Sequence, residues 1–232
     1  MSLKEFTKEL NGRNGKVEGE LIKTVFYSLL IGLGLLAILY YFKFRFIEGF
    51  LSNEGFFLFF AVLSYSLIIP TIRQVRAYRE FACMSGMMIG MTTGMIVGFL
   101  GGFYLGATNG MFVGSVFGMA VGILIGTWMG KCCGIMGFLE GIMAGFMGGL
   151  MGAMTAVMML NDNLKAATVV IFIISSVILF SLNYMIYKET RDNETERQLK
   201  EDHFWTLALS FILTAITAGI MVFGPRSALF GG

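Results

Sequence analysis

The sequence predicts an all-α integral membrane protein, a polytopic bundle of about seven transmembrane helices. Its composition is the first reason, because 56% of the 232 residues are hydrophobic, 14% are charged and the mean hydropathy is +0.76. A soluble domain of this size does not tolerate that composition. The second reason is a set of apolar runs of roughly 20 residues, the length that crosses a bilayer. The third is a glycine at every fourth position through much of 86–152, which predicts glycine-zipper packing of the third, fourth and fifth helices.

The apolar runs give the helix count. The stretch 81–160 is almost entirely apolar, with Lys131 and Glu140 as its only charged residues. Its length fits three crossings, separated at Thr108-Asn109 and at 131–133. The seven spans expected are therefore 21–42, 56–72, 81–105, 109–130, 134–160, 167–187 and 204–224.

The distribution of lysine and arginine predicts the orientation, because cytoplasmic loops are enriched in these residues. Seven spans place 13 of them on one side, in segments 1–23, 73–79, 131 and 188–200, and four on the other side: Lys43, Arg45, Lys165 and Arg226. We therefore expect a cell-membrane protein with a cytoplasmic N-terminus and an outside C-terminus. The expected organisation is a cytoplasmic amphipathic N-terminal segment (1–20), two helices (21–80), a Gly/Met-rich core (81–160), and two helices in 161–232 joined by a cytoplasmic loop (188–203).

Glycines in the core predict close helix packing. Twenty of the 31 glycines lie in 86–152. Small residues at every fourth position let helix backbones approach closely in lipid, where van der Waals contact replaces the hydrophobic drive. The packing positions expected are Gly86, Gly90, Gly94, Gly98, Gly110, Gly114, Gly118, Gly122, Gly126, Gly141 and Gly145.

Methionine is concentrated in the same region. Fifteen of the 18 methionines lie in 84–159, while the other spans use Leu, Ile and Phe. Spacing of four places three thioethers on one helical face, about 6 Å apart along the axis. Thioethers prefer soft ions, above all Cu(I), so such a ladder is a candidate metal pathway; the alternative is that methionine fills irregular gaps beside the glycines. The candidate thioether ligands are Met84, Met87, Met91, Met95, Met136, Met143, Met147 and Met151.

Four further residues belong to the candidate site. Cys83, Cys132 and Cys133 fall at the cytoplasmic ends of the three core helices, where converging thiols would suit exchange of a soft ion with a cytosolic metal carrier. The alternative is that they are small buried residues. Glu140 lies about 9 Å into its helix, where an ionisable group is costly and usually functional. It would neutralise a cation, accept a coupled proton, or simply bond to a neighbouring helix.

The MxxxM and GxxxG patterns resemble those of the Ctr-family copper importers, in which MxxxM lines a pore and GxxxG packs a trimer. The matching residues are Met87 with Met91 or Met143 with Met147, and Gly86 with Gly90 or Gly141 with Gly145. The resemblance covers about a dozen residues. It implies copper transport and oligomerisation, although seven spans depart from the three of that family. The pair Cys132-Cys133 is similar, again locally, to the cysteine pair of bacterial mercury-uptake membrane proteins.

These observations lead to three functional hypotheses. The first is a soft-metal transporter or metal-handling membrane protein that binds Cu(I). The second is a non-catalytic structural subunit of a membrane complex or homo-oligomer, packed through its glycines. The third is a cation or proton channel centred on Glu140. We do not expect an enzyme, because His203, the only histidine, falls in a predicted loop, and the expected partners are lipid, further membrane subunits and a metal carrier, not nucleic acid.

Overall fold

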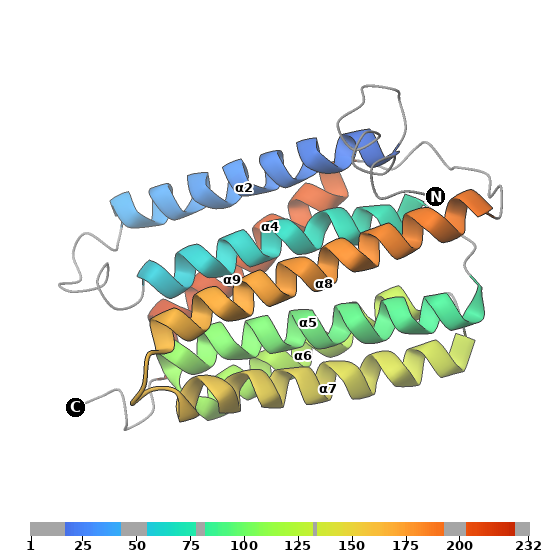
Figure 1. The fold of residues 1–232 in the computed structure, drawn as a ribbon. Helices are drawn as coiled ribbons and strands as arrows, with labels where there is room; N and C mark the ends of the chain where they lie inside the picture. The colour runs from blue at the N-terminus through green and yellow to red at the C-terminus, as the bar shows by residue number, and fades with distance from the viewer. Residues whose placement is uncertain (1–16, 43–54, 78–81, 132–133, 193–202, 226–232) are drawn as a thin grey trace.

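The computed structural model describes residues 17–42, 55–77, 82–131, 134–192 and 203–225, and these residues form helices with short turns between some of them (Figure 1). The described part contains seven helices, which confirms the predicted all-α helical bundle. In chain order they are α2 (Val17–Phe42), α4 (Gly55–Ala77), α5 (Cys83–Asn109), α6 (Met111–Gly130), α7 (Gly134–Met158), α8 (Leu164–Asp192) and α9 (His203–Phe223).

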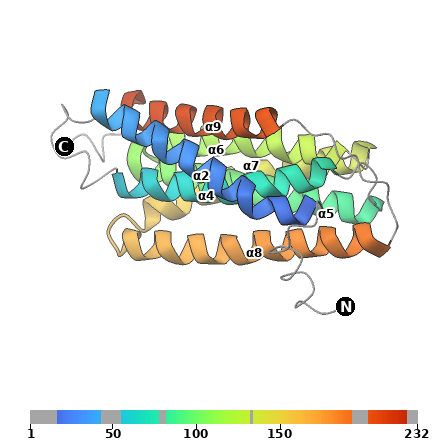
Figure 2. The same cartoon turned by 90° about the horizontal axis from the view of Figure 1, so that it is seen from above.

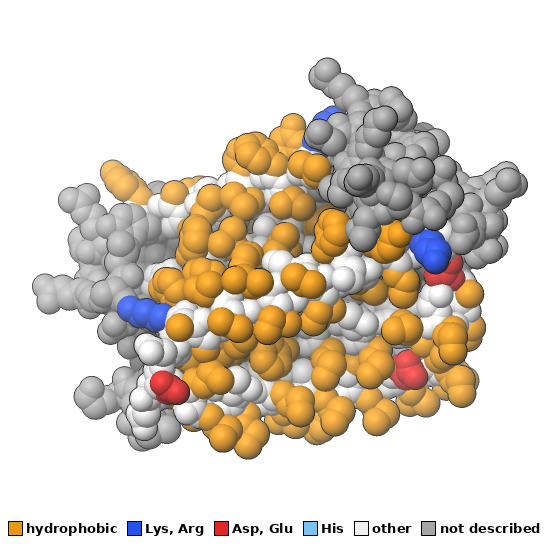
Figure 3. All heavy atoms as spheres, in the orientation of Figure 1, with side chains coloured by type: hydrophobic (Ala, Val, Ile, Leu, Met, Phe, Trp, Pro, Cys, Tyr) orange, Lys and Arg blue, Asp and Glu red, His pale blue; other side chains and the backbone are white. Residues whose placement is uncertain are grey.

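Five of the described helices, α4 to α8, are long and apolar enough to cross a membrane. The apolar stretches of α2 and α9 are shorter, at Ile22–Ile38 and Ala208–Phe223. Hydrophobic side chains cover the face shown in Figure 3, while charged side chains lie mainly near its two ends. The chain is therefore an integral membrane protein with about five spans.

The helix boundaries lie close to those expected, with three main differences. Helix α4 continues to Ala77, so most of the expected loop 73–79 is helical. Helix α8 continues to Asp192, so the first residues of the predicted loop 188–203 are helical. Within this extension the Glu189 carboxylate accepts a hydrogen bond from the Ala82 backbone N–H at 3.0 Å, which joins α8 to the beginning of α5. Helix α2 begins at Val17 and thus includes the end of the predicted segment 1–20, whose first 16 residues lie outside the described part.

Helices α5, α6 and α7 form a group that we call the glycine unit (Figure 1). Gly110 alone connects α5 to α6, with φ 108° and ψ 170°, a backbone conformation that only glycine adopts without strain. Gly110, expected at a helix-packing position, instead forms the turn that reverses the chain. Helices α5 and α7 consequently run parallel, with α6 antiparallel to both.

Helices α2, α4, α8 and α9 form the second group, with α8 and α9 on opposite sides of α4 in Figure 2. Helix α5 joins the two groups, because it packs against α4, α8 and α9 as well as against α6 and α7. Every residue from Leu100 to Asn109 is buried. The core of the protein therefore surrounds the C-terminal half of α5.

Candidate functional site

Glycines bring the three helices of the glycine unit into backbone contact. A Cβ atom added at Gly94 would lie 3.0 Å from the Cα of Gly126, and one added at Gly90 would lie 2.8 Å from the Cα of Gly130. The same holds between α6 and α7, where a Cβ at Gly126 would lie 2.8 Å from the Gly141 carbonyl oxygen. These distances are shorter than ordinary van der Waals contacts, so larger residues would force the helices apart.

The axis of the glycine unit therefore holds no passage for an ion. A Cβ at Gly122 would meet the Cα atoms of both Gly98 and Gly145, at 2.8 and 3.0 Å. Atoms of all three helices thus fill the middle of the unit, which leaves less room than one methyl group needs. An ion that uses the methionines must move along the outside of this unit.

Most methionines of the glycine unit lie on its outer surface. All the exposed large hydrophobic side chains of α5 are methionines, and the same side-chain type dominates the exposed side of α7. We call these residues the methionine face: Met84, Met88, Met91 and Met95 of α5, and Met136, Met143, Met147, Met151, Met154 and Met158 of α7. Met87, a predicted ligand, is half-buried beside this face.

Other helices provide a comparison for these exposed methionines. The exposed large side chains of α8 are Val, Ile and Phe, among them Val170, Ile173 and Ile174. Among the described residues, only Met129 and Met221 are fully buried methionines. Methionine on the glycine unit therefore marks a particular surface, and it does not mainly fill gaps in the interior.

The remaining candidate ligands lie toward one end of the glycine unit. Cys83 begins α5 and is exposed, whereas Cys132 and Cys133 lie outside the described residues. Glu140 is half-buried on α7, and it makes no hydrogen bond or ion pair with the described part of the chain. Nowhere in that part do three His, Cys, Asp or Glu side chains gather closely enough to hold a metal ion.

Buried polar contacts within the second group of helices, and between this group and α5, were not expected from the sequence. Ser28 of α2 hydrogen-bonds Ser210 of α9 at 2.8 Å, and Ser64 of α4 hydrogen-bonds Tyr104 of α5 at 2.7 Å. The guanidinium of Arg73 donates to the Thr24 hydroxyl. In an apolar environment such polar groups need partners, and here they join one helix to the next. Spaced serines within apolar runs were the only signal in the sequence.

Polar residues at the other end of the bundle form local structural contacts. The Asn109 amide donates to the Ile220 carbonyl of α9 at 2.9 Å, and its own oxygen accepts a hydrogen bond from Thr108. Asn161, Asp162 and Asn163 are exposed in the turn before α8. The Asp162 carboxylate there accepts a hydrogen bond from the Asn163 backbone N–H at 2.8 Å. These contacts fasten helix ends.

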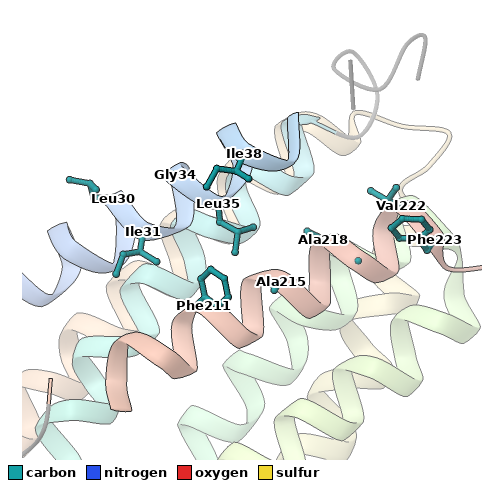
Figure 4. Close-up of a pocket in the computed structure, with 11 residues that line it drawn as sticks. Leu30, Ile31, Gly34, Leu35, Ile38, Phe211, Ala215, Ala218, Val222 and Phe223 are labelled. Atoms are coloured by element: carbon teal, nitrogen blue, oxygen red, sulfur yellow. The ribbon is translucent and has the colours of Figure 1, made fainter. Parts of the chain in front are cut away.

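An apolar groove of about 510 Å³ lies between α2 and α9 (Figure 4). Small residues form part of its wall, and a Cβ added at Gly34 or at Gly219 would meet nothing within 4 Å. Leu30, Ile38, Phe211 and other apolar residues complete the lining. The groove offers no metal ligand, so it is separate from the candidate metal site.

No family model, curated protein or solved structure matches this chain.

Proposed function

We propose that this membrane protein binds a soft metal ion, above all Cu(I), on its methionine face and conducts it along that face. The observation that carries the proposal is the exposure of the thioethers, which gather on the outside of α5 and α7 while the glycines face inward. Thioether sulfur is a soft ligand that suits Cu(I). Repeated weak sites also suit conduction, because an ion must leave each site as readily as it enters.

The composition of the face supports metal binding over simple lipid contact. Helix α8 is also exposed along much of its length, and there the chain uses Val170, Ile173, Ile174 and similar residues. Lipid contact therefore does not by itself require methionine in this protein. The gap-filling alternative is not favoured either, because a side chain such as Met143, 65% exposed, fills no interior space.

The packed glycine axis requires the ion path to lie on the outer surface. We propose that a second copy of the chain, or another membrane subunit, covers the methionine face and closes the path. The exposed Cys83 next to Met84 would then form an entrance, where a cytosolic carrier exchanges the ion. Seven membrane crossings with a cytoplasmic N-terminus remain our proposed topology.

A scaffold is the second candidate, and the backbone contacts among Gly94, Gly122 and Gly141 favour it. As a scaffold, the glycine unit would be the rigid core of a larger assembly, and the methionine face would only contact neighbouring subunits. The two candidates differ in whether the purified protein binds Cu(I).

Competition with a chromophoric Cu(I) chelator tests the proposal. The test variant changes Met87, Met91, Met143 and Met147 to Leu, a substitution that roughly conserves volume and keeps the fold. The matched control changes the buried Met129 and Met221 to Leu. We expect the wild type and the control to retain Cu(I) against the chelator and the test variant to lose it. If all three proteins retain Cu(I) equally, or if the folded wild type retains none, the proposed metal binding is refuted and the scaffold function remains.

A further inference from the structure

The contact between α5 and α7 has a regular register. A Cβ added at Gly148 would lie 3.0 Å from the Cα of Met95, and one added at Gly152 would lie 2.9 Å from the Cα of Phe99. Both pairs are offset by the same number of residues. Gly148 and Gly152 thus belong to one row of α7, spaced by four, that lies against one row of α5.

The same register can be followed toward the N-terminal ends of the two helices. One turn back, the same offset pairs Ala144 with Met91, and the 4% exposure of Ala144 agrees with a closed seam there. One more turn back, it pairs Glu140 with Met87, and both residues are half-buried. This register places the only acidic side chain of α7 next to a thioether of α5, at a level where the seam is more accessible.

We infer that Glu140, Met87 and Met91 form the first binding site of the metal path, in which one carboxylate and two thioethers hold a monovalent soft cation. Thioethers carry no charge, so a Cu(I) ion bound to them alone would bring a net positive charge into an apolar environment. One carboxylate makes the site neutral.

Two further observations support this assignment. An unpaired carboxylate in an apolar region is costly and normally has a functional partner, and Glu140 has no partner among the described residues. In addition, Glu140 stands about 9 Å from the beginning of α7 at Gly134, by helical rise. The site therefore lies near the end of the methionine face at which α5 begins, with Cys83 and Met84. The inference rests on the proposed function, because it assumes that the methionine face binds Cu(I).

The test compares Cu(I) affinities of the purified full chain and three variants. Glu140→Gln removes the charge and keeps the shape, and Met87→Leu removes one sulfur. Met111→Leu is the matched control, because this exposed methionine begins α6 and lies outside the methionine face. We expect Glu140→Gln and Met87→Leu each to weaken binding by at least about tenfold, with non-additive effects in the double variant. Met111→Leu should leave the affinity for the first bound ion unchanged.

X-ray absorption at the copper edge provides a second readout. With one equivalent of Cu(I), the wild type should show sulfur ligands and one oxygen ligand, and Glu140→Gln should lose the oxygen. A folded wild type that binds no Cu(I) would overturn the proposed function itself. The site at Glu140 alone would be overturned if the wild type binds Cu(I) without an oxygen ligand, or if Glu140→Gln binds Cu(I) with unchanged affinity. The wild-type spectrum decides this question even if the variant does not fold.

Discussion

Replacing Gly122 with alanine tests the packing of the glycine unit. Gly122 lies at the middle of α6, and a Cβ there would lie 2.8 Å from the Gly98 Cα, 2.9 Å from the Gly94 carbonyl oxygen and 3.0 Å from the Gly145 Cα. All three neighbours are backbone atoms, which no side-chain rotation can move. Ordinary contact begins at 3.4 Å, so α5 and α7 must each move away from α6 by about half an ångström.

The expected change in the free energy of unfolding of Gly122→Ala follows from two opposing effects. Alanine is favoured over glycine inside a helix by about 1 kcal/mol, while overpacking against backbone costs about 3 kcal/mol at the upper end of the usual range. Gly122→Ala should therefore lower the free energy of unfolding by about 2 kcal/mol. In Gly219→Ala the added Cβ meets nothing within 4 Å, so only the helix propensity acts and this control should gain about 1 kcal/mol.

Thermal unfolding in detergent provides the assay. A difference of about 3 kcal/mol between the two variants corresponds to a separation in Tm of about 6–12 °C for a chain of this size. Gly122→Ala should melt below the wild type and Gly219→Ala at or above it. Equal shifts for both variants would refute the packing argument, because alanine would then act through helix propensity alone.

Three further predictions concern single contacts. Ser64→Ala or Tyr104→Phe leaves one buried hydroxyl without its partner and should lower the free energy of unfolding by about 1–3 kcal/mol. In the same unfolding assay the double variant should lose less than the sum of the two single losses, and additive losses would contradict the hydrogen bond. Gly110→Ala places a side chain at φ 108° and should lower stability by about 1–3 kcal/mol, whereas an unchanged Tm would argue against this turn. Arg76 lies 5.2 Å from the Trp128 ring centroid, so Arg76→Gln should cost about 0.5–1 kcal/mol and alter tryptophan emission; an identical spectrum would contradict the contact.

Much of the fold could be predicted because the bilayer imposes a simple length on apolar segments. The division of 81–160 into three helices depended on the weak polar breaks at Thr108-Asn109 and Lys131, and the structure has helix ends at both. The four-residue spacing of glycines also predicted close helix contact, and Gly90, Gly94 and Gly126 lie within the backbone contacts described above.

The arrangement of side chains around those helices could not be predicted in the same way. Spacing shows that Met143 and Met147 share a face of α7, but not whether that face meets the interior or the outside. The outcome depends on the glycines, which occupy the opposite side of the helix. The contacts of Ser28 with Ser210 and of Ser64 with Tyr104 were missed because they join residues far apart in the chain, and no periodicity within one helix shows which hydroxyl will lie opposite another.

The most direct test of the account is the copper content of the protein purified from cells supplied with copper, measured by elemental analysis. The wild type is compared with the variant in which Met87, Met91, Met143 and Met147 are replaced by Leu. We expect at least one copper per chain in the wild type and a clear loss of copper in a variant that folds normally. Copper-free wild type that is correctly folded and remains copper-free after addition of Cu(I), or equal copper in both proteins, would contradict the claim that the methionine face binds the metal.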